Sequence, residues 1–247
     1  MSETKIYLLD VEGTVAPLTL TAKVLFPYAR KHFANFLEQR FGDSVQPDLA
    51  MLIAENGSES EVDAPRIPYS RVPSPEEGSL VSDFQLRALA YLDWLMDRDR
   101  KSTALKSLQG KIWKAGFESG ELKGTLFPDV PAAFAGWASD AQVAIYSSGS
   151  TEAQRLLFRY SIFGDLTPLI AGYFDTRIGP KQASASYSAI AAAMKVEPGE
   201  VLFFSDVVRE LDPAREAGCQ TRLVVREGNA PVEGANGHAV VESFAVL

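Results

Sequence analysis

The stretch IYLLDVEGT, residues 6–14, joins four apolar residues to a glycine turn that carries two carboxylates. An apolar run without polar alternation is typical of a strand that is buried on both faces of a parallel sheet. Two later runs end in the same manner: residues 143–146 lead into Ser147, and residues 201–204 lead into a serine and Asp206. These three stretches predict the centre of a parallel sheet whose strands end in polar residues.

Helical patterns lie between the expected strands. Residues 184–195 place apolar side chains on one helical face, and residues 210–217 end at Gly218, a typical helix-capping residue. Shorter strands are expected at residues 171–174 and, at the edge of the sheet, at residues 221–225. This alternation predicts an α/β fold with a Rossmann-like parallel sheet core.

Residues 18–125 interrupt the alternation with a region whose regular patterns are all helical. Residues 21–41 and 80–96 carry apolar side chains at helical spacing, whereas four prolines within residues 55–79 predict a loop. The pattern therefore predicts a helical insertion after the first strand. The expected domains are the α/β core, residues 1–17 and 126–247, and the inserted helical domain, residues 18–125.

The composition is that of a globular protein, with 247 residues of which 46% are hydrophobic and 23% charged. The net charge of −8 argues against nucleic acid as the main partner, and the apolar runs are too short to cross a membrane. The single cysteine, Cys219, excludes an intrachain disulfide and is typical of a reducing compartment. Because residues 1–4 carry no secretory signal, we expect a cytoplasmic protein. No interface stripe is evident, so we expect a monomer.

Asp10 and Glu12 stand two residues apart at the end of the first strand, and Gly13 lets the backbone turn away from them. Two carboxylates this close repel each other unless a cation intervenes. Mg²⁺ prefers carboxylate, phosphate and water oxygens, so we predict one Mg²⁺ per chain, held by Asp10, Glu12 and Asp206. An ionised Asp10 could attack phosphorus in line, with Glu12 as the acid and base of the two half-reactions. Ordinary turns also carry such pairs, so this interpretation depends on the other segments.

Ser147 and Ser148 lie between a buried strand and a helix that begins near Thr151. Backbone N–H groups at a helix N-terminus, together with small hydroxyl side chains, suit a phosphate group. Lys181 precedes the next helix, and its charge would neutralise both Asp10 and the oxygens of a transferring phosphoryl group. We predict Ser147, Ser148 and Lys181 as substrate-binding residues.

In chain order, DVEGT, YSSGS, GPK and FFSDVVRE resemble the four motifs of the haloacid dehalogenase-like phosphohydrolases. The helical insertion after the first motif is similar to the cap domain of that superfamily. Most members have aspartate where this chain has Glu12. The roles that the resemblance implies are nucleophile for Asp10, acid–base for Glu12, phosphate binding for Ser147 and Lys181, and metal binding for Asp206, which Glu210 supports.

Five segments narrow the resemblance: DVEGT, LFPYAR (25–30), DRKSTALKSLQGKIW (99–113), YSSGSTEAQRLLF (146–158) and GYFDTRIGPK (172–181). They are similar to the enolase-phosphatases of methionine salvage, also called acireductone synthases. The resemblance implies a bifunctional enzyme whose substrate is the small phosphorylated diketone 2,3-diketo-5-methylthiopentyl-1-phosphate. It is enolised first and then loses its phosphate to give the acireductone. The base that removes the carbon-bound proton is not identified by the sequence, and Glu12 is a candidate.

Three other functions are compatible with parts of the pattern. A generic small-molecule phosphomonoesterase of the same superfamily would use the same core motifs, and only the cap segments argue against it. A carbon–halogen dehalogenase would need neither Glu12 nor Asp206. A protein-binding module that had lost catalysis would lack at least one site residue, and none is missing.

Overall fold

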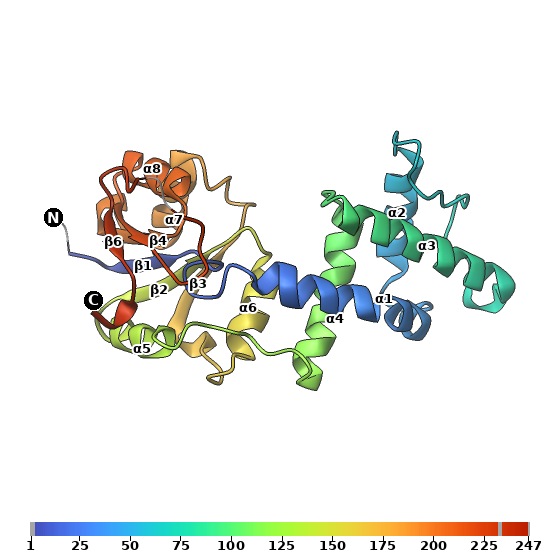
Figure 1. Cartoon of the computed structure of the whole chain (residues 1–247), viewed down its shortest axis with the longest axis horizontal. Helices are drawn as coiled ribbons and strands as arrows, with labels where there is room; N and C mark the ends of the chain where they lie inside the picture. The colour runs from blue at the N-terminus through green and yellow to red at the C-terminus, as the bar shows by residue number, and fades with distance from the viewer. Residues whose placement is uncertain (1–2, 232–233, 247) are drawn as a thin grey trace. The chain divides into compact units, whose positions relative to one another are not determined.

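The computed structural model describes residues 3–231 and 234–246, and Figure 1 shows the whole chain. Its internal contacts divide the chain into two compact units, residues 1–21 with 117–247 and residues 22–116. Of the expected core domain, residues 1–2, 232–233 and 247 lie outside the described residues.

The expected cap, residues 18–125, contains the whole of the 22–116 unit, but its flanks belong to the other unit. The reason is visible at residues 117–124. The Phe117 ring stacks on that of Tyr160 with centroids 6.1 Å apart, and the Gly124 N–H donates to the Tyr160 carbonyl at 2.8 Å. A Cβ at Gly124 would overlap the Leu157 carbonyl oxygen. The backbone at Gly124 therefore lies closer to the helix Thr151–Arg159 than a larger residue would permit.

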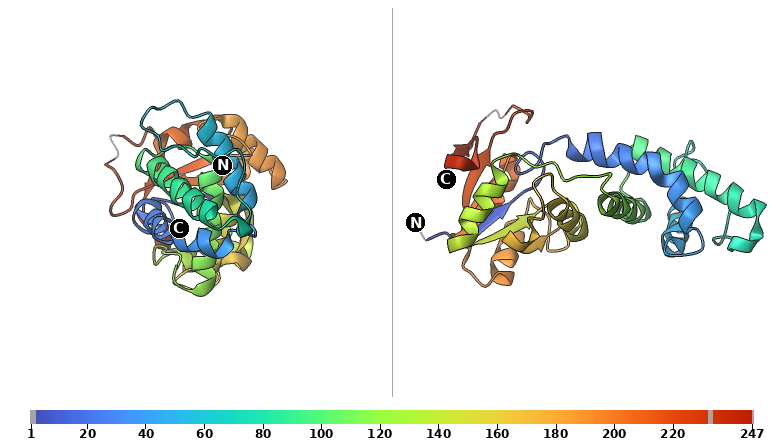
Figure 2. Two further views of the ribbon diagram at one scale, coloured as in Figure 1. Left: turned by 90° about the vertical axis from the view of Figure 1, so that its right-hand side faces the viewer. Right: turned by 90° about the horizontal axis from the view of Figure 1, so that it is seen from below.

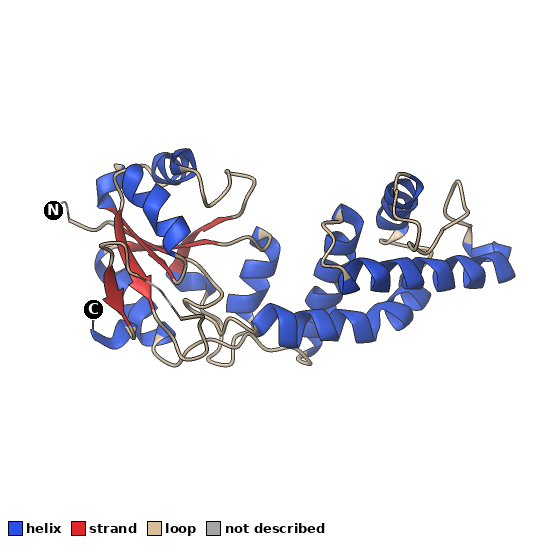
Figure 3. Ribbon diagram, turned by 45° about the horizontal axis from the view of Figure 1, so that its top comes forward, coloured by secondary structure: helices blue, strands red, loops and turns tan. Residues whose placement is uncertain are grey.

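The first unit contains one six-stranded sheet in which all neighbouring strands run parallel. The strand order is β3-β2-β1-β4-β5-β6, which places β1 between strands that come much later in the chain. Figure 3 shows these strands in red. Their bounds are Ile6–Leu9 (β1), Gln142–Tyr146 (β2), Ile170–Phe174 (β3), Val201–Ser205 (β4), Gln220–Val224 (β5) and Ala239–Val241 (β6).

The prediction of an edge strand at residues 221–225 was wrong about its place in the sheet. Strand β5 is an interior strand, because β6 pairs with it in parallel from Arg222 opposite Ala239 to Val224 opposite Val241. Strand β6 has only three residues, which is too short a run to produce a recognisable alternation in the sequence.

Helices cover both faces of the sheet: in Figure 1, α7 and α8 lie on one side of the strands and α5 and α6 on the other, and Figure 2 gives two further views. On one face Leu8 packs in a cluster with Ile190 of α7 and Leu211 of α8. On the other face the Tyr7 ring stacks on Trp137 of α5, with centroids 4.5 Å apart. This two-sided burial explains the unbroken apolar run in β1. The helices are α5 (Val130–Asp140), α6 (Thr151–Arg159), α7 (Ser184–Ala193) and α8 (Val208–Glu216).

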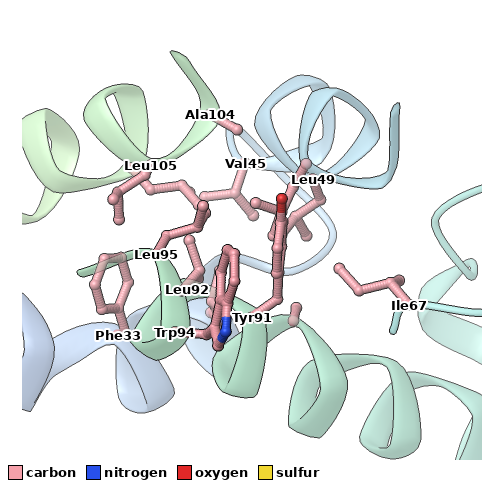
Figure 4. Close-up of a cluster of buried hydrophobic side chains, with 14 of the residues drawn as sticks. Phe33, Val45, Leu49, Ile67, Tyr91, Leu92, Trp94, Leu95, Ala104 and Leu105 are labelled. Atoms are coloured by element: carbon pink, nitrogen blue, oxygen red, sulfur yellow. The ribbon is translucent and has the colours of Figure 1, made fainter. Parts of the chain in front are cut away.

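The 22–116 unit is helical and has a hydrophobic core of its own, part of which Figure 4 shows. Phe33, Tyr91 and Leu92 are among its fully enclosed side chains. Lys111 and Asp48 form an ion pair at 2.5 Å between two of its helices. The helices are α1 (Phe26–Arg40), α2 (Gln46–Gly57), α3 (Ser79–Asp97) and α4 (Thr103–Ser119), the last of which continues into the first unit.

Two predicted bounds in this region need correction. The helix expected from residue 21 begins as a π-helix, Thr21–Leu25, and becomes α-helical only at Phe26. Pro27 has no N–H to donate to the carbonyl four residues earlier, so the regular α-helical ladder restarts there. The loop expected over residues 55–79 begins only after Gly57, where α2 ends. Asn56 holds that loop, since its side chain donates to the Pro65 carbonyl at 2.8 Å.

None of the helices within the described ranges has both the length and the apolar run that crossing a membrane requires.

A buried and an exposed leucine of helix α3 provide a test of which residues form the core of the 22–116 unit. Replacing Leu92, which is fully buried, by alanine should lower the free energy of unfolding of this unit by about 2–5 kcal/mol, because the cavity cannot fully collapse. Urea unfolding followed by tryptophan fluorescence measures the change. The matched control is Leu86→Ala in the same helix, whose side chain is 69% exposed and whose loss should cost less than about 0.5 kcal/mol. Equal losses for the two variants would contradict the assignment of the core.

Candidate active site

The order in which the chain adds strands to the sheet reverses beside β1. The chain passes from β1 outward through β2 and β3, returns to the other side of β1, and continues outward through β4 and β5. Ligands of open parallel sheets bind outside the carboxyl ends of the strands at such a switch point. Asp10 and Asp206 directly follow the two strands that meet there, β1 and β4.

The turn after β1 is tight and internally hydrogen-bonded. The Val11 carbonyl accepts from the N–H groups of Val15 and Ala16, both at 2.9 Å, and the Val11 N–H donates to the Asp10 carboxylate at 2.7 Å. Gly13 adopts a φ of 73°, and a Cβ at this position would overlap the carboxylate of Asp206. Glycine is therefore required both by the backbone conformation and by the closeness of Asp206.

Lys181 joins two of the acidic residues directly. Its Nζ lies 2.5 Å from the Asp10 carboxylate and 2.8 Å from that of Glu210, and only 6% of the residue is exposed. Burial alone would lower the pKa of Lys181, but the charges of Asp10 and Glu210 outweigh it and raise that pKa. Lys181 is therefore a fixed cation in contact with the predicted nucleophile.

Three hydroxyl groups hold consecutive carbonyls of the segment that carries Lys181. The Tyr146 hydroxyl donates to the Gly179 carbonyl, and the Ser186 hydroxyl donates to that of Pro180, both at 2.8 Å. The Tyr187 hydroxyl lies 2.8 Å from the Lys181 carbonyl and 2.9 Å from that of Glu210. All three hydroxyl-bearing residues are buried, so the backbone under the lysine is held rigidly.

The acidic groups outnumber this cation. Burial and the charge of Asp10 raise the pKa of Asp206 to about 7, and burial followed by the charge of Asp10 also raises the pKa of Glu210. Within the described part of the chain, the buried Asp206 Oδ1 atom has no hydrogen-bond partner. Carboxyl groups that are this costly to ionise, with an oxygen left unpaired, suit a divalent cation.

Glu12 shares the turn with Asp10, but its carboxylate accepts a hydrogen bond from the Thr21 N–H at 2.9 Å. No three acidic, histidine or cysteine side chains among residues 3–231 and 234–246 converge as a metal-ligand group. The predicted ligand set of Asp10, Glu12 and Asp206 is thus not assembled by side chains alone, because Glu12 is engaged with the backbone and Asp10 with Lys181. Two carboxylates, Asp10 and Asp206, are still sufficient protein ligands for Mg²⁺, which usually completes its shell with phosphate and water.

Ser147 and Ser148 follow β2, the strand beside β1. Ser147 is half-buried and Ser148 is exposed. The Ser147 hydroxyl accepts from the Gly149 N–H at 3.3 Å, and the Ser150 hydroxyl caps α6 by accepting from the Ala153 N–H at 3.2 Å. The cap fixes the helix N-terminus next to Ser147 and Ser148, as a phosphate site requires.

Sequence reasoning missed the buried polar residues that support the site. Tyr187 lies in the helix expected over residues 184–195, and its ring packs in the core as the apolar pattern there predicts, but its hydroxyl also reaches two backbone carbonyls. Gln154 is similar, since its amide donates to the carbonyls of Gly149 and Phe174 at 2.8 Å each. The local pattern of apolar residues does not reveal such partners, because they are backbone carbonyls of loops and of other elements.

Comparison with known proteins agrees with this geometry. The family model for haloacid dehalogenase-like hydrolases matches residues 4–218. "Enolase-phosphatase E1" of Synechococcus elongatus is 50% identical over 228 residues, covering 92% of this chain and 90% of that protein. "Enolase-phosphatase E1" of Pseudomonas aeruginosa is 42% identical over 243 residues, covering 98% and 96%. The crystal structure of the UTR4 protein of Saccharomyces cerevisiae has a TM-score of 0.77 at 32% identity, covering 99% of this chain and all of that one.

The fold and the site define a hydrolase of the haloacid dehalogenase-like class. Within that class, the chain belongs to the enolase-phosphatase family.

The pairing of Lys181 with two buried carboxylates provides a test with a defined pH dependence. Lys181→Met should lower the free energy of unfolding by about 3–5 kcal/mol at pH 8, because it leaves like charges buried without their cation. The pKa of Glu210 is already raised, so in the variant this group takes up a proton as the pH falls. A carboxyl whose folded-state pKa is raised destabilises the fold above that pKa and not below it, so the loss should shrink at pH 5.

Urea unfolding at the two pH values measures the effect. Lys123→Met, at an exposed position of the same unit, is the control and should change stability by less than about 0.5 kcal/mol at either pH. A loss for Lys181→Met that is the same at pH 8 and pH 5 would rule out the electrostatic explanation.

Proposed function

We propose that the chain is a bifunctional enolase-phosphatase of methionine salvage, which converts 2,3-diketo-5-methylthiopentyl-1-phosphate through its enol to the dephosphorylated acireductone. The observation that carries the proposal is the contact of Lys181 with Asp10 at a sheet switch point, beside a serine loop and Asp206. The near full-length similarity to curated enolase-phosphatases supports the choice of substrate.

Phosphate transfer follows from the properties of these residues. Ser147, Ser148 and Lys181 bind the phosphate group, and the lysine offsets negative charge on its oxygens. Asp10 attacks phosphorus, so that the bond to the leaving oxygen breaks as the aspartyl-phosphate bond forms. Glu12 donates a proton to the leaving oxygen and then accepts one from the water that hydrolyses the aspartyl-phosphate.

Phosphatases of this superfamily generally use Mg²⁺. We infer one Mg²⁺ per chain, held by Asp10 and Asp206. Glu12 is assigned to proton transfer, because its carboxylate accepts a hydrogen bond from the Thr21 N–H. When bound, the ion would offset the charge of the carboxylates and of the phosphate group. We further infer a monomeric, cytoplasmic enzyme without nucleic-acid or membrane partners, in line with the acidic composition and the single cysteine.

The test of the function follows both half-reactions in one cuvette. With the diketone phosphate and Mg²⁺, enol absorbance should rise before free phosphate does, and a chelator should suppress both. Asp10→Asn should abolish phosphate release, because an amide cannot act as the nucleophile. Phosphate release from common sugar phosphates but not from this diketone would instead support the generic phosphomonoesterase.

The raised pKa of Asp206 predicts how pH controls Mg²⁺ binding. This pKa, about 7, refers to the metal-free protein, and binding requires the ionised carboxylate. The apparent affinity should therefore weaken by up to about tenfold per pH unit below pH 7, and binding near neutral pH should release protons. Calorimetric titration in two buffers of different ionisation enthalpy measures both quantities.

The same group affects folding without the metal. Because the folded-state pKa of Asp206 lies above its ordinary value of 3.8, its ionised carboxylate destabilises the folded state fully above pH 7, and this destabilisation is relieved as the pH falls towards 4.

For the binding of Mg²⁺, Asp206→Asn, which cannot ionise, is the control and should remove the pH dependence of metal binding. An affinity for Mg²⁺ that is constant between pH 5.5 and 8 in the parent protein would contradict the role of Asp206.

A further inference from the structure

A segment near the end of the chain holds the turn that carries Asp10 and Glu12. The Asn229 side-chain amide donates to the Gly13 carbonyl at 2.8 Å, and Arg226 Nε donates to the Thr14 carbonyl at 3.2 Å. These residues follow β5 and lie more than 200 positions from the turn in the sequence. They belong to none of the four motifs to which the chemistry has been assigned.

The turn depends on these two side chains for part of its hydrogen bonding. The carbonyls of Val15 and Ala16 accept from backbone N–H groups, those of Phe127 and Gly13. The carbonyls of Gly13 and Thr14 accept from side chains instead. Side-chain donors therefore complete the turn at Gly13, which adopts a left-handed backbone conformation with a φ of 73°.

The position of Gly13 also determines the spacing of the acidic groups. Its α-carbon lies so close to Asp206 that no Cβ fits between them. Asp10 lies three residues before Gly13 and Glu12 directly before it, so a rotation of the Gly13 peptide changes how all three carboxylates face one another. The hydrogen bond from Asn229 opposes that rotation.

Several buried contacts hold the side chain of Arg226 in place. Only 8% of the residue is exposed, and its guanidinium pairs with Asp129 at 2.8 Å. The same group lies 4.6 Å from the ring centroid of Phe127 and 4.5 Å from that of Phe244. Replacing Arg226 would leave a buried charge on Asp129 and disturb the fold, whereas half-buried Asn229 makes one contact with the turn and can be changed with less damage.

We propose that Asn229 is a positioning residue for phosphoryl transfer: by holding the Gly13 carbonyl it sets the placement of Asp10 and Glu12 relative to Asp206. The proposal rests on the proposed phosphatase chemistry. It does not depend on which phosphate ester is the substrate.

The experiment compares kcat and KM for Asn229→Ala and Asn229→Asp with those of the parent enzyme. Both variants should lower kcat for phosphate release by about tenfold to a hundredfold, because small misplacements of reacting groups have effects of that size. The aspartate variant should be the slower, since its carboxylate would face the Gly13 carbonyl oxygen without a proton to donate. KM and the inhibition constant of inorganic phosphate should stay within about twofold, because Lys181, Ser147 and Ser148 are untouched.

The matched control is Asn236→Ala in the same C-terminal region. Its side chain donates to both Asp212 carboxylate oxygens at 2.8 Å and does not belong to the turn. It should leave kcat unchanged, whatever its effect on the melting temperature. A merely structural role for Asn229 would give both variants the same kcat per folded molecule.

Parental kcat in Asn229→Ala, or a raised KM with unchanged kcat, would overturn the proposal. Measuring the variants with p-nitrophenyl phosphate as well as the diketone phosphate separates this outcome from failure of the proposed function. If the parent hydrolyses only p-nitrophenyl phosphate, the choice of substrate is wrong, and the kcat comparison on that ester still decides the role of Asn229.

Discussion

One buried ammonium group is the constraint on which the rest of the site depends. Lys181 contacts Asp10 and Glu210, and without it the strand ends would bring together carboxylates that could not all be ionised. Three hydroxyl–carbonyl contacts from Tyr146, Ser186 and Tyr187 hold its backbone. Several residues with no chemical role in the reaction are therefore required so that one charge stays in place.

The same balance bears on the proposed binding of a cation and of a phosphate group at this site. Asp206 has a raised pKa and a carboxylate oxygen without a hydrogen-bond partner in the described residues. Its negative charge is therefore not balanced by Lys181, and a further cation would stabilise it. A phosphate group in turn needs positive charge to enter an acidic site. A divalent ion and a phosphate ester would each reduce the cost of binding the other.

Strands β1 and β4, and the acidic residues at their ends, could be predicted because the signals are local. Four apolar residues followed by Asp10 show both the strand and the polar group, and parallel pairing brings such ends together. The tertiary contacts could not be predicted. The three residues of β6, the hydroxyl of Tyr187 and the amide of Asn229 acquire their roles from partners far away in the sequence, and the π-helix at Thr21–Leu25 has no compositional signal.

The position of β1 in the sheet has a consequence for synthesis on the ribosome. Its four apolar residues leave the ribosome long before its neighbours β2 and β4, which begin only at Gln142 and Val201. At about 5–20 residues per second, strand β1, which Asp10 directly follows, waits on the order of 10–40 s for β4. The intervening helical unit has a complete core and can fold during this interval, which leaves β1 as the unpaired apolar segment that a chaperone would need to protect.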